Sequence, residues 1–163
     1  MPGPRRARAA DARAYAFVSE WEADASAAQC WALLERALRP GPVPWWPAAR
    51  VDAVPEPLAP GGNIALTVRS PVGYRLHVGL TLTAVSPPRA LAATSAGDLV
   101  GRGALDIADR PGGARLTWTW QVEVRRPWMR RASPVLRPVF EAAHRTVMRR
   151  GERGFARLLA AGA

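Results

Sequence analysis

The last third of the chain places a half-buried strand directly before a long amphipathic helix. Residues 116–124 alternate apolar and polar side chains, which predicts a strand with one buried face. Residues 136–158 then carry an apolar stripe at helical spacing, with arginines on the opposite side. One histidine, His144, and two glycines, Gly151 and Gly154, interrupt this stripe. A sheet that closes over a helix with such gaps predicts a cavity between the two.

The rest of the chain predicts two short elements after the first strand and a series of further strands. Residues 15–23 favour a strand, and Ser26 then stands three residues before Gln29, a capping-box pattern that predicts a helix over 27–38. Residues 44–47, Pro-Trp-Trp-Pro, predict a second short turn or helix. Alternation with a period of two predicts further strands over residues 51–54, 64–69, 74–83, 91–95 and 101–108. Short connections make these six or seven strands an antiparallel meander with one polar and one apolar face.

Positive charge is concentrated at the two ends of the chain. The 23 basic residues are all arginine, and the net charge is +10. Residues 1–13 carry four arginines and one aspartate, residues 125–163 carry ten arginines and two glutamates, and the stretch between is nearly neutral. A basic helix face is either simply solvated or docks on an anionic membrane or nucleic acid. The absence of lysine beside abundant alanine, proline and glycine fits a GC-rich genome, which weakens the arginine excess as evidence for nucleic-acid binding.

The sequence lacks the motifs of several functional classes. A lone cysteine, Cys30, excludes a disulfide framework and a thiolate metal cluster, and its neighbours predict a small buried side chain. The chain has no HExxH, GxSxG, P-loop or dinucleotide-binding motif. No apolar run approaches the roughly 20 residues that span a bilayer, and no signal-peptide core follows the basic N-terminus. We therefore expect a cytoplasmic protein with no metal and no cofactor, and a disordered basic tail over residues 1–13.

Six local motifs follow one another in the order found in a known superfamily. They are Trp45-Trp46-Pro47 after the first helix, Tyr74-Arg75-Leu76 on the central strand, Gly97-Asp98-Leu99 with Gly101 and Gly103, Pro127-Trp128-Met129, Leu136-Arg137-Pro138-Val139-Phe140, and His144 followed by Val147-Met148-Arg149-Arg150-Gly151. Over about residues 15–160 this pattern resembles the START-like (SRPBCC) superfamily, and within it a bacterial polyketide cyclase/dehydrase-like subfamily. The resemblance implies an α+β helix-grip fold, in which a curved antiparallel sheet of six or seven strands wraps around a long C-terminal helix. It also implies two short helices after the first strand, and a single domain over residues 14–160.

Three positions depart from the pattern of that subfamily. Its members often carry tryptophan where this chain has Leu105, and Trp-Asn where it has Ala142-Ala143 before the histidine. Each replacement removes side-chain volume or a polar group. If these positions face inward, the pocket is larger and drier here than in such relatives.

The resemblance places a ligand pocket between the sheet and the last helix. The residues predicted to line it are Trp45, Trp46, Leu66, Leu76, Val78, Leu105, Trp118, Trp120, Phe140, Val147 and Gly151. The aromatic side chains either stack on a flat ligand or fill the core. Gly151 either leaves room for a ligand or lets neighbouring segments approach closely.

Polar residues of this pocket supply candidates for chemistry. His144 and Tyr74 are the predicted proton-transfer groups, since a buried histidine with a shifted pKa can exchange a proton with a carbonyl or enol. The alternative for His144 is a core histidine that is hydrogen-bonded to the protein. Asp98 and Arg102 are predicted as a polar pair at the mouth of the pocket, and the alternative for Asp98 is a structural Asx-turn.

Three functions follow from these features. The first is binding of a hydrophobic small molecule, such as a polyketide, a lipid or an aromatic metabolite, driven by apolar burial. The second is a polyketide cyclase or dehydratase on the same scaffold, acting mainly by positioning the substrate. The third is docking on an anionic membrane, or less favourably on nucleic acid, through the basic C-terminal helix. The sequence predicts no particular oligomeric state.

Overall fold

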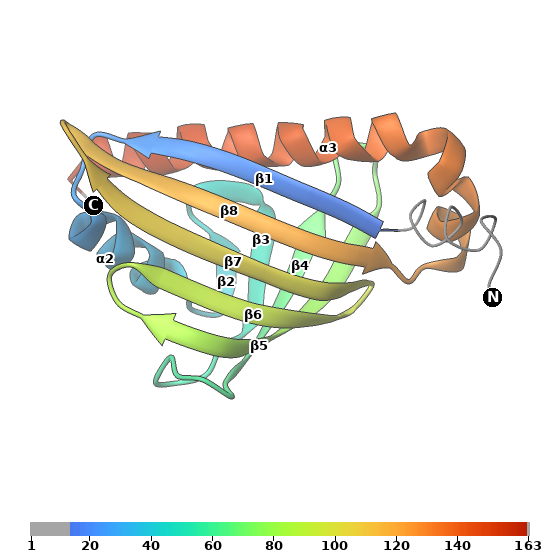
Figure 1. The fold of residues 1–163 in the computed structure, drawn as a ribbon, viewed down its shortest axis with the longest axis horizontal. Coiled ribbons are helices and arrows are strands. Elements are labelled where there is room, and N and C mark those ends of the chain that lie inside the picture. Colours follow the sequence, from blue (N-terminus) through green and yellow to red (C-terminus); the bar gives the residue numbers. More distant parts are fainter. Residues whose placement is uncertain (1–13, 163) are drawn as a thin grey trace, which may run out of the picture.

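An eight-stranded antiparallel sheet curls around one long C-terminal helix in the computed structural model (Figure 1). The structure describes residues 14–162, except the side chains of residues 133 and 134. The predicted tail over residues 1–13 lies outside the described residues. Within them, no helix is both long and apolar enough to cross a membrane.

The elements follow one another as a meander. In chain order they are β1 (Ala14–Ala23), α2 (Ala27–Ala37), β2 (Gly41–Val43), β3 (Trp46–Ala53), β4 (Asn63–Arg69), β5 (Arg75–Ser86), β6 (Ala90–Gly97), β7 (Leu99–Arg110), β8 (Gly113–Val124) and α3 (Pro127–Ala160). The strand order across the sheet is β1-β8-β7-β6-β5-β4-β3-β2. Each strand from β2 to β8 therefore pairs with its neighbour in sequence, and β1 adds to the outer edge of β8. The predicted α+β helix-grip fold is confirmed.

The region after α2 differs from the prediction. Residues 44–47 do not form a second short helix, because Val43 pairs with Trp46 and the two residues between them turn the chain from β2 into β3. This raises the strand number to eight. Proline explains the difference, since a ring nitrogen cannot donate within a helix but is tolerated in an edge strand and a turn. Pro42 lies in β2, which is the edge of the sheet.

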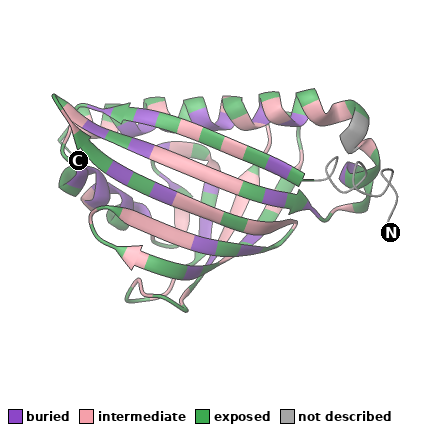
Figure 2. Cartoon of the chain, viewed as in Figure 1, coloured by how far each residue is buried: buried purple, intermediate pink, exposed green. Residues whose placement is uncertain are grey.

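Local sequence patterns account for most of the other elements. The Ser26 hydroxyl accepts a hydrogen bond from the Gln29 amide, and the Gln29 side chain accepts one from the Ser26 amide, which confirms the capping box at the start of α2. Along β8, the side chains of Leu116 and Val122 are buried while those of Arg115 and Gln121 are exposed. The same alternation of buried and exposed positions marks neighbouring strands in Figure 2.

Helix α3 lies along the concave side of the sheet and packs against β1 and β3. Its buried positions include Phe140, Ala143, Val147 and Phe155. Five of its arginines, at positions 145, 149, 150, 153 and 157, project outward to solvent. The ribbon bends near its start, so that the first turns cross the end of the sheet (Figure 1).

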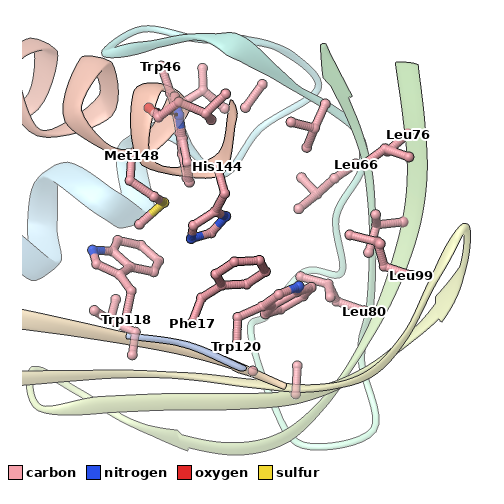
Figure 3. A pocket seen from close by; sticks show the side chains of 18 of the residues that line it. Phe17, Trp46, Leu66, Leu76, Leu80, Leu99, Trp118, Trp120, His144 and Met148 are labelled. Atoms are coloured by element: carbon pink, nitrogen blue, oxygen red, sulfur yellow. Dashed lines mark hydrogen bonds between the residues drawn. The ribbon is translucent and has the colours of Figure 1, made fainter. Parts of the chain in front are cut away.

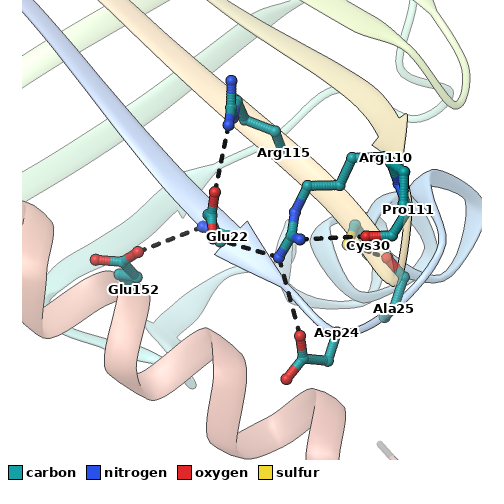
Figure 4. Close-up of polar contacts among 8 residues, drawn as sticks. All are labelled: Glu22, Asp24, Ala25, Cys30, Arg110, Pro111, Arg115 and Glu152. Atoms are coloured by element: carbon teal, nitrogen blue, oxygen red, sulfur yellow. Dashed lines mark hydrogen bonds and ion pairs between the residues drawn. The ribbon is translucent and has the colours of Figure 1, made fainter.

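A polar cluster joins α3 to the end of β1 (Figure 4). The Glu22 carboxylate accepts contacts from Arg110 and Arg115, each at 3.3 Å. The Glu22 amide donates to the Glu152 carboxylate of α3 at 3.4 Å. Glu22 and Arg115 are exposed and Arg110 and Glu152 are half-buried, so these contacts contribute modestly to stability while they link the helix to the strand.

Candidate ligand-binding cavity

A cavity of about 330 Å³ lies between the concave face of the sheet and α3 (Figure 3). Side chains from the sheet, from α2 and from α3 all contribute to its wall. Almost all of them are apolar, and no arginine is among them. Two lining residues, Glu35 and Pro71, are exposed, so the cavity reaches the surface near α2 and near the β4–β5 turn.

Tryptophans close one end of this cavity. The rings of Trp21 and Trp118 lie 5.0 Å apart between centroids, and Trp45 meets Phe155 edge-on at 5.1 Å. The indole of Trp46 donates a hydrogen bond to the carbonyl oxygen of Val147 at 2.9 Å, which anchors β3 to α3. This end of the interior is therefore solid core, whereas the space beyond it is open.

The two helix glycines belong to the packed end rather than to the cavity. A Cβ atom on Gly154 would overlap the backbone carbonyl of Trp45. A Cβ atom on Gly151 would lie about 3.0 Å from the Trp21 ring and 3.2 Å from the Trp46 ring. Gly151 is therefore not a ligand-lining residue, and that prediction is corrected. Both glycines allow α3 to approach the tryptophans, which offsets the cost of glycine in a helix.

His144 is the most unusual group in the cavity wall. Its ring stacks on Phe17 with centroids 3.9 Å apart and an interplanar angle of 18°. Within residues 14–162, neither ring nitrogen has a hydrogen-bond partner. Burial lowers the pKa of His144 from 6.5 to about 4, and the positive charge of Arg145 acts in the same direction. The imidazole is therefore neutral at pH 7 and has a free nitrogen acceptor.

Tyr74 lies at the other end of the cavity, in a second aromatic group. Its ring meets Trp128 edge-on at 5.6 Å and Phe140 at 6.2 Å. Met129, buried at the start of α3, lines the cavity beside them. The first turns of α3 thus cover this end of the sheet with side chains from a single short segment.

Asp98 and Arg102 do not form a pair at the mouth of the cavity. Asp98 makes an ion pair with Arg126 at 2.9 Å and accepts the His77 amide at 2.8 Å. The hydrogen bond from Arg126 is the main reason that the pKa of Asp98 lies below its usual value. Arg102 instead donates to Gln121 on the neighbouring strand. Neither side chain lines the cavity, and Asp98 serves to fasten the β6–β7 connection to the start of α3.

The structure brings the other candidates together around one space. All of the remaining predicted residues line the cavity: Tyr74, Trp45, Trp46, Leu66, Leu76, Val78, Leu105, Trp118, Trp120, Phe140, His144 and Val147. At the positions that depart from the subfamily, Leu105 and Ala143 line the wall, while Ala142 is exposed.

Some lining residues were not predicted as part of the site. Phe17 and Met148 are the two that contribute most to the surroundings of His144 (Figure 3). Phe17 alternates with buried Tyr15 on β1, and Met148 lies one helical turn after His144. Both signals were present in the sequence, but only the curl of the sheet places Phe17 under the imidazole.

Comparison with solved structures places this cavity on a known scaffold. Protein TTHA0849 from Thermus thermophilus superposes with a TM-score of 0.70 at 15% identity, over 91% of this chain and 100% of that one. The Zhui aromatase/cyclase from Streptomyces sp. R1128 gives 0.66 at 14% identity, over 88% and 92%. The di-domain aromatase/cyclase BexL from the BE-7585A biosynthetic pathway gives 0.65 at 15% identity, over 89% of this chain and 50% of that one.

At these identities the likeness concerns the fold, and family membership rests on the sequence. No curated protein matches the sequence. The family described as polyketide cyclase/dehydrase and lipid transport matches residues 16–161, which is nearly the whole described chain. With its curled sheet, gripped helix and apolar interior, the chain belongs to the polyketide cyclase/dehydrase and lipid transport family.

Proposed function

We propose that the protein binds an uncharged hydrophobic small molecule, of the polyketide, aromatic or lipid type, between the sheet and α3. The main support for this proposal is the apolar lining of the cavity, in which the imidazole of His144 is neutral. The names of two structural neighbours, both aromatase/cyclases, agree with a ligand of this type. So does the family description, which joins polyketide cyclases and lipid transport.

The size of the cavity suits a small guest. Its volume of about 330 Å³ lies at the lower end of the range of roughly 300–1,000 Å³ for small-molecule sites. Burying about 300 Å² of apolar ligand surface would contribute about 7 kcal/mol before the cost of immobilising the ligand. A compact ring system or a folded chain would gain most, because both fill a short cavity without protruding into water.

The charges of the wall favour a neutral guest. No arginine lines the cavity, although the chain has 23 of them, and Glu35 lines it only where it meets solvent. A carboxylate buried in this wall would lose hydration with no cation to compensate it. We therefore expect dodecanol to displace a bound probe at least tenfold more effectively than dodecanoate does at pH 7.5.

A pair of neighbouring alanines tests the cavity directly. Ala143 lines the wall and Ala142 is exposed, so leucine at each position makes the same change inside and outside the cavity. We expect Ala143→Leu to weaken binding of the neutral dye N-phenyl-1-naphthylamine at least tenfold. Ala142→Leu should change the dissociation constant less than twofold.

Dye affinities are compared only for variants that still unfold cooperatively on heating. Equal affinities for the two variants, or no dye binding by the parent protein, would contradict the proposal. If Ala143→Leu fails to fold, leucine at Ala49, a buried alanine that also lines the cavity, takes its place.

A second function, cyclisation or dehydration of a bound polyketide, is favoured by one observation. The unpartnered, neutral nitrogen of His144 faces the cavity and can accept a proton from a carbon or hydroxyl next to a carbonyl. The protein would be added to an enzymatic system that makes a linear poly-β-ketone, and the aromatic products measured. A cyclase should change the product ratio, and His144→Leu should abolish that change while dye binding persists. An unchanged product ratio with the parent protein would leave binding as the function.

A further inference from the structure

We propose that one end of the molecule docks on an anionic lipid bilayer. The docking surface consists of four exposed side chains, hereafter the apolar rim: Val72, Trp128, Val135 and Val139. Their exposed fractions are 56%, 46%, 80% and 42%. Among the described residues, the only other large apolar side chain this exposed is Val18, on β1. This proposal concerns the outer surface and does not depend on the cavity having a ligand.

Ring contacts bring the parts of the apolar rim to the same end of the fold. Val72 lies in the β4–β5 turn, two residues before Tyr74, whose ring contacts Trp128 at 5.6 Å. Trp128 in turn contacts Phe140 at 6.3 Å, next to Val139. These contacts join the β4–β5 turn to the start of α3, at the end of the molecule where α3 begins (Figure 1), and Val135 lies one helical turn before Val139 on the same helix.

Unpaired arginines surround the apolar rim. Arg69 and Arg75 flank the β4–β5 turn, and Arg125, Arg130 and Arg131 flank Trp128; all five are exposed. Within residues 14–162, none of these five makes an ion pair. No acidic residue lies between positions 57 and 97 or between 124 and 140. The surface is thus strongly positive as well as apolar.

This combination fits a lipid surface better than any other anionic partner. Tryptophan and aliphatic side chains insert at the boundary of headgroups and acyl chains, and flanking arginines bind anionic headgroups. Each arginine near such a surface strengthens binding about fivefold. Nucleic acid would use the arginines but would leave the three valines exposed.

The position of the apolar rim relates it to the cavity. Pro71, directly before Val72, is exposed and lines the cavity. A molecule docked through the apolar rim would therefore present one opening of the cavity to the bilayer. An apolar guest could then pass between membrane and protein without crossing water.

The first experiment measures sedimentation with large vesicles of phosphatidylcholine containing about 30% phosphatidylglycerol, at about 0.1 M NaCl. The test variant is Val135→Glu and the matched control is Val18→Glu, which makes the same change at an exposed valine outside the apolar rim. We expect the partition coefficient to fall at least tenfold for V135E and less than twofold for V18E. Equal losses for the two variants would overturn the proposal.

The second experiment tests the charges. R130Q/R131Q should lower the partition coefficient about 25-fold, from two arginines at about fivefold each. R149Q/R153Q removes the same charge from the distant part of α3 and should cost less than fivefold. Parent binding that is as strong to pure phosphatidylcholine, or unchanged at about 0.5 M NaCl, would contradict an anionic docking surface.

Two further measurements separate the alternatives. A duplex DNA that binds tightly, with loss in R130Q/R131Q and none in V135E, would reassign the surface to nucleic acid and overturn the proposal. Binding of N-phenyl-1-naphthylamine in the absence of vesicles reports on the cavity alone. V135E should keep that binding, so failure of membrane docking and failure of cavity binding are distinguishable.

Discussion

Replacing His144 with leucine should make the folded protein more tolerant of acid. The imidazole has a pKa of about 4 in the folded chain and 6.5 when solvated, because burial against Phe17 disfavours its charged form. Between these two values the unfolded chain binds more protons than the folded one, so stability falls as pH falls through this window. Leucine has no proton to bind, and the variant should lack this loss.

The size of the effect follows from the two pKa values. Relative to pH 7, the histidine should cost the parent about 2 kcal/mol at pH 5 and about 3 kcal/mol at pH 4. The free energy of unfolding would be measured in urea by circular dichroism at pH 5, 6, 7 and 8, for parent and H144L. Acidic groups such as Asp98 titrate in both proteins, so their contribution cancels in the difference.

A clear result would refute this reasoning. If the difference in unfolding free energy between parent and H144L stays constant within about 0.5 kcal/mol from pH 8 to pH 5, the imidazole is not held neutral by burial. In the folded protein, the affinity for a neutral dye should also stay constant between pH 6 and 8, because His144 keeps one protonation state there. A dye affinity that follows a titration near pH 6.5 would contradict the same assignment.

Three further predictions concern the framework of the site. Gly154→Ala should destabilise the protein by about 2 kcal/mol, because the added Cβ would overlap the carbonyl of Trp45 even though alanine has the higher helix propensity. A variant that is more stable than the parent in thermal unfolding would show that α3 does not pack tightly against Trp45. Ser26→Ala should cost about 1 kcal/mol in urea unfolding through loss of the capping box, and no measurable change would contradict that role. Cys30 is fully buried and burial raises its pKa to about 11, so a thiol reagent at pH 8 should label it only after unfolding; labelling of the native protein within minutes would disprove this.

Local patterns in the sequence predicted the strand and the helix that face the site. The alternation over residues 116–124 and the stripe over 136–158 both became elements with the predicted side buried, because period and burial are linked in a single segment. Residues 44–47 were harder to interpret. A proline-rich aromatic run favours a turn or a short helix, and only the pairing of Val43 with Trp46 makes it the turn of a hairpin.

The site itself depended on contacts between distant parts of the chain. The sequence predicts Arg102, on the next strand, as the partner of Asp98, but Arg126 at the start of α3 forms the ion pair instead. From the sequence, the missing side chain at Gly151 leaves space on the apolar face of the helix for a ligand. In the structure the rings of Trp21 and Trp46 fill that space.

Period and capping therefore sufficed for most elements and their buried faces, since each depends on residues close in sequence, and the family was indicated by the resemblance of motifs along the chain. The stacking of Phe17 on His144, the size of the cavity and the closure of one end by tryptophans depend on how far the sheet curls. That curl is set by the packing of all eight strands against α3. It can be read only once the whole chain is folded, because no single segment encodes it.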